Sequence, residues 1–313
     1  MKIVFLDAKT IGEDIDLSGF DALGEVVKYG FSTAQEARER SKDADVLILN
    51  KVQVNEQTIG EADHLKLVCV TATGTNNLDK EYLNKRGIAW RNVAGYSTES
   101  VAQHTFAMLF YLLEKLPYYD NYVKSEKYVN DVSFTHFAKA FHELSGMTYG
   151  IIGLGNIGRR VADIAKVFGC RVIYYSTSGR NSQLGYERVS FDELLEQSDI
   201  VSIHAPLDEN TLGLMNKEAF AKMKKSAILL NVGRGPIINE ADLAEALNNK
   251  TIAAAGLDVL SVEPMQEDNP LRGIKDSERL LITPHIAWAG VEARNRLMGI
   301  ILGQIKEFFK AHE

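Results

Sequence analysis

The chain has 313 residues, which exceeds the usual length of a single domain, so we expect two domains. Its hydrophobic content of 45% and charged content of 25% are ordinary for a globular protein. The formal net charge is −7 and no block of basic residues occurs, which argues against a nucleic-acid or membrane-surface role.

The chain begins with MKIVFLDA, a short apolar stretch that contains Asp7. This pattern predicts a buried first strand and no signal peptide. No apolar run reaches membrane-spanning length. Cys69 and Cys170 lie in apolar, strand-like contexts, which indicates buried thiols and a cytoplasmic location.

The first third of the sequence alternates between apolar strand candidates and amphipathic helical windows. This alternation predicts a small domain with a parallel sheet. We expect strands at residues 2–8, 25–29, 45–50, 66–72 and 88–93, with helices within residues 33–42 and 78–86.

A long helix is predicted over residues 97–117. Ser97 or Thr98 can cap its start, Glu99 lies in its first turn, and Pro117 should end it. Apolar residues cover much of its circumference, so we expect it to be buried between domains or between subunits.

A second α/β series follows, and it completes a fold of two doubly wound parallel-sheet domains. Ser190 and Glu193 have capping-box spacing and predict one helix start, and a terminal amphipathic helix could return to the first domain. The expected strands of this series are residues 149–155, 171–176, 200–206, 227–233, 254–260 and 279–285.

The motif GLGNIG supplies Gly153, Gly155 and Gly158 with the G-x-G-x-x-G spacing. In a dinucleotide site the first glycine permits a tight turn, the second lets a pyrophosphate approach, and the third lets helix pack on strand. Free N–H groups at the helix start would hold the phosphates. The hexapeptide alone also matches a plain turn, but here a strand precedes it and a helix follows.

Three polar residues follow strands of the second series: Arg234, Glu263 and His285. Ligands bind at the carboxyl ends of strands in doubly wound sheets, so these side chains could share one cleft. Individually they could be a surface arginine, a turn glutamate and a capped histidine. Together they suit one reaction. The histidine exchanges a proton with a carbonyl oxygen, the glutamate favours imidazolium, and the arginine holds a substrate carboxylate.

The end of the second Rossmann strand lacks the acid that usually binds the adenosine ribose of NAD. Ser176 stands there, 18 residues after Gly158, and Arg180 follows it. An acid would repel the extra phosphate of NADP, so its absence predicts that NADPH is accepted at least as well as NADH. Alternatively, Arg180 points into solvent and the serine only weakens discrimination.

The order of GLGNIG, HAPL, NVGRG, GLDVL with EP, and TPHIAW resembles the D-isomer-specific 2-hydroxyacid dehydrogenase family. VTATGTNNLD and NVAGYSTESVAQHTFAML are similar to its first-domain and hinge segments, so the resemblance covers nearly the whole chain. It implies Arg234 as substrate anchor, His285 as general acid and base, and Glu263 as the carboxylate that orients and charges the histidine.

The resemblance also implies contacts with NAD(P) and with the substrate. The cofactor contacts, beside the three glycines and Arg180, would be Asn156, Ile157, Ser176, Pro206, Val232 and Asp258, the last near the nicotinamide carboxamide. The backbone of Thr73 and Gly74 would bind the substrate carboxylate, unless this is an ordinary glycine turn. Lys51 could face the cleft or be a solvated surface lysine. No metal is expected.

Within the family, TATGTNN, GYSTESVA and TPHIAWA are most similar to glycerate dehydrogenase and hydroxypyruvate reductase. Two departures are Gln103, where many relatives have glutamate, and residues 124–141, which lack the usual tryptophan. Trp288 could line the substrate pocket or pack on the terminal helix. The rivals are a dehydrogenase of D-lactate or of branched D-2-hydroxy acids, and a non-catalytic, NAD-sensing, corepressor-like protein.

The resemblance further implies how the protein is organised. We expect a substrate-binding domain of residues 1–97 plus 290–313, a nucleotide-binding domain of residues 98–289, and a cleft between them. A homodimer is expected, both by resemblance and from the apolar helix of residues 98–116. Hinge closure should exclude water before hydride transfer.

Overall fold

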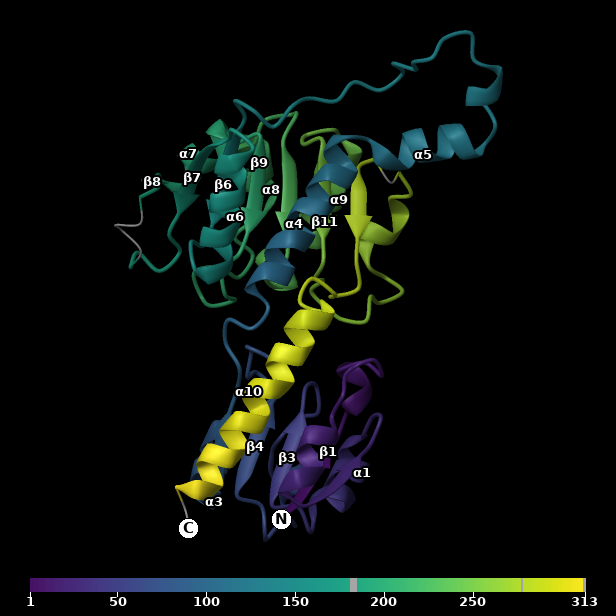
Figure 1. Cartoon of the computed structure of the whole chain (residues 1–313). Helices are drawn as coiled ribbons and strands as arrows, with labels where there is room; N and C mark the ends of the chain where they lie inside the picture. Colours follow the sequence, from purple (N-terminus) through teal and green to yellow (C-terminus); the bar gives the residue numbers. More distant parts are fainter. Residues whose placement is uncertain (181–184, 277, 312–313) are drawn as a thin grey trace. The chain divides into compact units, whose positions relative to one another are not determined.

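The structure is a computed structural model that describes residues 1–180, 185–276 and 278–311. The polypeptide forms two compact units, Met1–Ser97 with Ala289–Glu313 and Thr98–Trp288 (Figure 1). Each unit contains one parallel sheet. The first boundary between the units follows Ser97, where the sequence predicts it. The second follows Trp288, one residue before the boundary that the sequence predicts after residue 289.

The first unit is built on a five-stranded parallel sheet in the order β2-β1-β3-β4-β5. Its strands β3 and β4 are wholly buried, which explains their nearly continuous apolar sequence. The strands are β1 Lys2–Phe5, β2 Glu25–Lys28, β3 Val46–Leu49, β4 Leu67–Val70 and β5 Ala89–Arg91. The predicted strands are therefore all present.

Helices cover both faces of this sheet. Ala37, Ile59 and Leu83, from α1, α2 and α3, belong to the apolar cluster on one face. On the other side of β1, Phe5 packs edge-on against Phe20 of the 3₁₀ helix η2, with ring centroids 5.3 Å apart. The helices are η1 Ala8–Thr10, η2 Ser18–Leu23, α1 Ala34–Ser41, α2 Glu56–Ile59, α3 Lys80–Arg86 and α10 Val291–Lys310.

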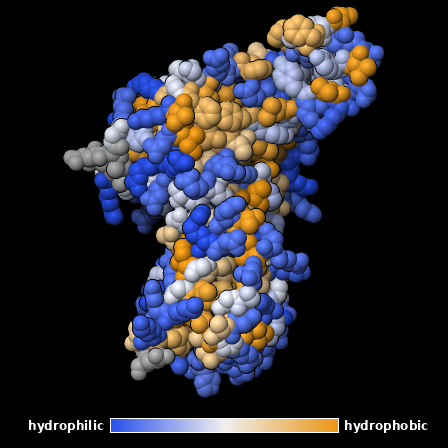
Figure 2. Space-filling view, viewed as in Figure 1, coloured by the Kyte–Doolittle hydropathy of each residue, from blue (hydrophilic) through white to orange (hydrophobic). Residues whose placement is uncertain are grey.

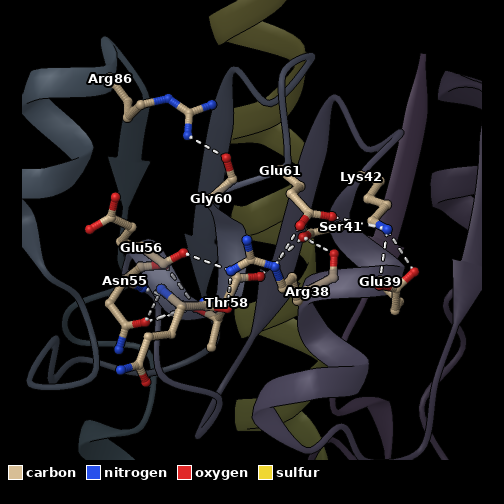
Figure 3. A network of polar contacts seen from close by, with 11 residues as sticks. Arg38, Glu39, Ser41, Lys42, Asn55, Glu56, Thr58, Gly60, Glu61 and Arg86 are labelled. Atoms are coloured by element: carbon tan, nitrogen blue, oxygen red, sulfur yellow. Dashed lines mark hydrogen bonds and ion pairs between the residues drawn. The ribbon is translucent and has the colours of Figure 1, made fainter.

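A network of polar contacts joins α1 to α2 (Figure 3). Glu61 accepts from Arg38 at 2.8 Å and lies 3.0 Å from the ammonium of Lys42, and Ser41 donates to the carbonyl of Thr58. Most of these charges are exposed, so each ion pair contributes about 1 kcal/mol at most. The network links α1 to α2 and contains none of the predicted site residues.

The second unit contains a seven-stranded parallel sheet in the order β12-β11-β10-β9-β6-β7-β8. The sheet grows outward from β6 in both directions, which is the Rossmann arrangement with a switch point beside β6. The strands are β6 Thr148–Ile152, β7 Arg171–Tyr175, β8 Glu187–Arg188, β9 Ile200–Ile203, β10 Ile228–Asn231, β11 Ala254–Leu257 and β12 Leu280–Ile282. Of these described strands, the sequence missed β8.

Two apolar clusters lie on the two faces of this sheet. One contains residues of α4 and α6, and the other contains residues of α7, α8 and α9. The capping box of Ser190 and Glu193 starts α7 as predicted. The helices are α4 Thr98–Leu113, α5 Leu116–Lys124, α6 Asn156–Val167, α7 Phe191–Gln197, α8 Lys217–Lys222 and α9 Glu240–Asn248, with 3₁₀ turns η3 Tyr128–Asn130, η4 Gly235–Ile237 and η5 Pro270–Gly273.

The prediction of one helix over residues 97–117 is wrong about where the helix ends and about the role of Pro117. It ends at Leu113, and Pro117 lies in the first turn of a second helix, α5, where a proline loses no intrahelical hydrogen bond. Lys115, with φ of 55°, makes the break. Helix α4 is buried as expected, and its residues Met108 and Leu112 pack against Gly256 in the sheet of its own unit.

Helix α5 and the segment after it form an arm, residues 114–143, that projects from the rest of the second unit (Figure 1). The exposed fractions of Val132, Phe134 and Phe137 are 102%, 88% and 87%, and hydrophobic residues gather on this arm in Figure 2. The imidazole of His136 stacks on Tyr122 with ring centroids 3.8 Å apart, so the arm has a small aromatic core of its own.

Both cysteines are free and buried, as predicted. Burial raises the pKa of Cys69 to about 12 and that of Cys170 to about 11, so both thiols stay protonated and unreactive. Among residues 1–180, 185–276 and 278–311, no helix combines the length and apolarity that a membrane span requires.

Candidate active site

The glycine loop joins β6 to α6, and each of its three glycines has a distinct structural reason. Gly153 has φ of +90°, and a Cβ there would lie 2.7 Å from the backbone of Ala205. A Cβ on Gly158 would lie 2.3 Å from the carbonyl oxygen of Gly153, so helix and turn pack closely. A Cβ on Gly155 would meet nothing within 4 Å, which leaves open space at the start of α6.

This open space fits a dinucleotide phosphate. Gly155 is the N-cap of α6, and it has no side chain that could accept hydrogen bonds from the first N–H groups of the helix. The first turn contains no acidic residue. Helix N-termini with free N–H groups bind anions. Asn156 is exposed and Ile157 is half-buried, so the loop residues predicted to contact the cofactor lie at this edge of the sheet.

Ser176 follows the carboxyl end of β7, as expected for the ribose position. Its side chain is buried, with 5% exposed, and its Oγ has no hydrogen-bond partner among residues 1–180, 185–276 and 278–311. The exposed polar groups of this loop therefore come from the residues after it, Ser178 and Arg180. The backbone N–H of Arg180 donates to Ser178 Oγ at 3.4 Å.

His285 and Glu263 form the closest pair among the predicted catalytic residues. Nδ1 of the imidazole donates to the Glu263 carboxylate at 2.7 Å, which leaves Nε2 to meet a substrate. The second carboxylate oxygen accepts from the backbone N–H of Leu260 at 3.0 Å. The glutamate is thus fixed from both sides, and the ring of His285 is fixed by the glutamate.

The backbone of His285 has φ of 55°, a left-handed conformation that costs a non-glycine residue about 1–3 kcal/mol. Its N–H donates to the carbonyls of Asp258 at 2.8 Å and Thr283 at 2.9 Å, which hold this conformation. The indole N–H of Trp288 donates to the carbonyl of His285 at 2.9 Å. Trp288 therefore supports the loop that carries the histidine.

Asp258 is 1% exposed and binds the same loop. Its carboxylate accepts from the N–H groups of Ile286 and Ala287 at 2.9 and 2.8 Å and from the hydroxyl of Thr283 at 2.6 Å. Burial alone would raise the pKa of Asp258. Hydrogen bonds from His104, Thr283 and these N–H groups lower the pKa by a larger amount, so the net pKa is below its ordinary value. Asp258 stays ionised and positions His285.

His104 of α4 completes this group, and sequence reasoning missed it. Its Nε2 lies 3.0 Å from the hydroxyl of Thr283 and 3.5 Å from Asp258. The sequence offers one indication of its role, a polar residue on an otherwise apolar helix. It does not indicate the partners of His104, because they lie about 150 to 180 residues away in the sequence. Gln103, next to it, is exposed.

Arg234 is held in a turn after β10 by Asn231, which sequence reasoning also missed. Asn231 is fully buried, its side-chain amide donates to the carbonyl of Arg234 at 3.0 Å, and its oxygen accepts from the N–H of Gly233 at 3.0 Å. The guanidinium donates to the carbonyl of Gly233 at 2.8 Å and is otherwise half-exposed. Its other donors can meet a carboxylate.

The strands bring these residues to one edge of the sheet. Strand β11 pairs with β10 and β12, so the loops bearing Arg234, Glu263 and His285 follow three adjacent parallel strands. A Cβ on Gly235 would lie 1.9 Å from the backbone of Leu260, so the arginine turn and the glutamate turn are in direct contact. The structure thus juxtaposes the three predicted catalytic residues.

His204 of the HAPL motif also follows a strand at this edge, but it cannot donate a proton at neutral pH. Its Nδ1 is buried, and burial lowers the pKa of the imidazole to about 3. Nε2 lies 2.9 Å from the hydroxyl of Ser202. The predicted cofactor contacts Pro206 and Val232 are exposed and buried, respectively, and both follow strands at the same edge.

In the first unit, the predicted substrate residues also follow strands. Lys51 comes after β3 with its side chain exposed, and Thr73 and Gly74 lie in the loop after β4. Thr73 donates its hydroxyl to the carbonyl of Val93 at 2.9 Å. The buried carboxylate of Asp7, missed from the sequence, accepts the N–H of Lys51 at 2.7 Å and fixes the lysine's backbone.

Within the described parts of both units, no group of three or more His, Cys, Asp or Glu side chains could hold a metal ion.

Comparison with known proteins shows which family the sequence matches. Residues 106–287 match the family described as "D-isomer specific 2-hydroxyacid dehydrogenase, NAD binding domain". The protein is 39% identical over 310 residues to a "Putative 2-hydroxyacid dehydrogenase" of Haemophilus influenzae, covering 98% of each sequence. It is 39% identical over 317 residues to a "Hydroxypyruvate reductase" of Blautia hydrogenotrophica, covering 99% of this sequence and 97% of that protein.

Two solved structures are similar over nearly the whole length. An acyclic imino acid reductase in complex with NADPH and D-Arg has a TM-score of 0.86 and 28% identity, covering 99% of this protein and 98% of the other. A D-lactate dehydrogenase from Aquifex aeolicus, complexed with NAD and lactic acid, has a TM-score of 0.84 and 26% identity, covering 99% and 96%.

Proposed function

Because the chain belongs to the D-isomer-specific 2-hydroxyacid dehydrogenase family, we propose that it reduces a small 2-oxo acid of the hydroxypyruvate or glyoxylate type to the D-2-hydroxy acid. It is an oxidoreductase with a nicotinamide cofactor, which supplies the hydride when bound. The 2.7 Å pair of His285 and Glu263, beside the Arg234 turn, is the observation that carries the proposal.

Each of these residues has one task in the proposed reaction. Arg234 binds the substrate carboxylate with its planar fork and holds the adjacent carbonyl in place. Nε2 of His285 donates a proton to the carbonyl oxygen as that oxygen gains charge, and takes it back in the reverse direction. Glu263 accepts from Nδ1, which fixes the ring and directs Nε2 toward the substrate.

The cofactor would lie along the carboxyl edge of the second sheet. The start of α6 supports phosphate binding, and Pro206, Val232 and Asp258 are the proposed contacts nearer the nicotinamide. In the first unit, the backbone of Thr73 and Gly74 is the proposed contact of the substrate carboxylate, and Lys51 is a further proposed substrate contact. These assignments rest on the family and on the placement of each residue after a strand.

Glu263→Gln tests the charge of the pair. The amide keeps the size of the side chain but removes the negative charge that lies 2.7 Å from Nδ1. The imidazole of His285 then loses the carboxylate that orients it, so the turnover number for reduction should fall while cofactor binding changes little. Glu240→Gln, at a glutamate that binds the N–H of Ser261, is the matched control. An unchanged turnover number would mean that the charge of Glu263 plays no part in the reaction.

We propose that NADPH is accepted at least as well as NADH, because no acid stands at the ribose position. Ser176→Asp should lower the catalytic efficiency with NADPH about 10-fold or more, since one like-charge contact costs about 1–2 kcal/mol. Ser176→Ala is the control. It should change little, since Ser176 Oγ forms no hydrogen bond within the described part of the protein and alanine adds no charge. A strong preference of the wild-type protein for NADH would refute the proposal.

A homodimer is proposed from the arm of residues 114–143. An arm with Val132, Phe134 and Phe137 almost fully exposed suits burial against a second copy. Sedimentation should give about twice the protomer mass of 34.8 kDa, and a monomer at micromolar concentration would contradict this assembly. The free, buried cysteines support a cytoplasmic location.

Reduction of 2-oxo acids that yield D-lactate or branched 2-hydroxy acids is the alternative within the family, and a substrate panel separates these activities. A cofactor-sensing protein without turnover is the alternative from another class. The intact set of Arg234, Glu263 and His285 favours an enzyme, because a sensor needs no proton donor.

A further inference from the structure

The two-residue strand β8 positions an arginine that has no assigned role. Tyr174 of β7 pairs with Arg188, and Ile173 pairs with Glu187. Directly paired residues of parallel strands point to the same face of a sheet, and alternate residues of one strand share a face. Arg188 therefore shares its face with Tyr174 and with Ser176, two residues farther along the sequence.

This face is the one that α6 covers. Tyr174 belongs to the apolar cluster that contains residues of α6. Tyr186, two residues before Arg188, donates its hydroxyl to Asp163 of α6, and the ammonium of Lys166 lies 4.0 Å from its ring centroid. Arg188 thus lies on the side of the sheet where α6 begins at the glycine loop.

The guanidinium of Arg188 reaches the loop that begins at Ser176, where a serine stands in place of the ribose-binding acid. Its Nη1 donates to the carbonyl of Gly179 at 3.3 Å. Glu187, the neighbouring carboxylate, pairs instead with Arg171 at 2.8 Å. Among the residues that the structure describes, no carboxylate pairs with Arg188 or with Arg180. Two exposed cations that have no acidic partner in the described part of the protein therefore lie at one loop.

We propose that Arg188 determines cofactor specificity by binding the 2′-phosphate of NADP. The inference rests on the proposed use of NADP and names the residue that would recognise it. A guanidinium presents paired donors that match phosphate oxygens, and a phosphate dianion gains far more from this contact than the ribose hydroxyl of NAD. Arg180 and Ser178 supply a second cation and a hydroxyl on the same loop. Sequence reasoning missed Arg188 because it lies outside the loop, on a strand too short to show a pattern.

The test uses the adenosine fragments of the two cofactors, which isolate the phosphate from hydride transfer. Dissociation constants for 2′,5′-ADP and 5′-AMP are measured by calorimetry for the wild-type protein, Arg188→Ala, Arg188→Lys and Arg171→Ala. Arg171 is the matched control, because it is an exposed arginine at the amino end of β7, paired with Glu187.

Arg188→Ala should weaken 2′,5′-ADP binding about 10- to 100-fold, as expected for lost hydrogen bonds to a charged group, and leave 5′-AMP binding within about twofold. Arg188→Lys should recover part of the loss, and Arg171→Ala should change neither constant. Retained 5′-AMP binding shows that the variant is folded.

Three results would overturn the inference in different ways. If Arg188→Ala still prefers 2′,5′-ADP as strongly as wild type, another group binds the phosphate and the proposed NADP use stands. If it loses both ligands equally, Arg188 only supports the loop through Gly179. If the wild-type protein itself binds both fragments equally, the proposed NADP use fails and this assignment fails with it.

Discussion

Replacing His285 by alanine should lower the turnover number for 2-oxo acid reduction at least ~100-fold, the low end for loss of a general acid. The structure supports this size of effect because the other histidine following a strand at this edge, His204, has a pKa lowered to about 3 by burial and stays neutral. Among the described residues that follow strands at this edge, no second imidazole can thus replace the proton donor.

Cofactor affinity should change little in this variant, because the imidazole is assigned to the substrate carbonyl and not to the dinucleotide. Binding of the reduced cofactor is measured by fluorescence titration beside steady-state kinetics. His64→Ala, at an exposed histidine of the first unit, is the control and should keep normal turnover. Near-normal turnover of the His285 variant would refute the assignment.

Replacing Arg234 by lysine should lower catalytic efficiency about 10- to 100-fold, although the positive charge is kept. Lysine lacks the planar fork that makes two parallel hydrogen bonds to a carboxylate, and a hydrogen bond to a charged group contributes about 1.5–3 kcal/mol. The loss should fall on both kcat and KM if the arginine also positions the carbonyl.

The turn that carries Arg234 should survive this substitution, because Asn231 binds the backbone at this position and not the guanidinium. Unfolding by denaturant should therefore have the same midpoint in wild type and variant. If the lysine variant matches wild type in efficiency, bidentate anchoring is wrong.

The placement of the three proposed catalytic residues at one sheet edge was predictable, because it follows from local sequence patterns. Arg234, Glu263 and His285 each follow an apolar strand, and adjacent parallel strands end at the same edge. The 2.7 Å contact of His285 with Glu263 then follows from topology. Gly153 and Gly158 were likewise predictable, since the glycine spacing encodes a turn and a helix contact within six residues.

The supporting residues were not predictable, because their partners are distant in the sequence. His104 contacts Thr283, which lies 179 positions away in the sequence, and the sequence around either residue does not indicate this contact. Asn231 looked like an ordinary strand end, and only its complete burial shows that it holds the arginine turn. Pro117 was misread because proline fits the first turn of a helix as well as the end of one.

The most direct test is steady-state reduction of hydroxypyruvate, glyoxylate, pyruvate and a branched 2-oxo acid by the purified protein, with NADH and with NADPH, followed by chiral analysis of the product. The account predicts turnover with hydroxypyruvate or glyoxylate as the preferred substrate, D-glycerate as the product of hydroxypyruvate, and NADPH used at least as efficiently as NADH. An L-product, or cofactor binding without turnover of any 2-oxo acid, would contradict it.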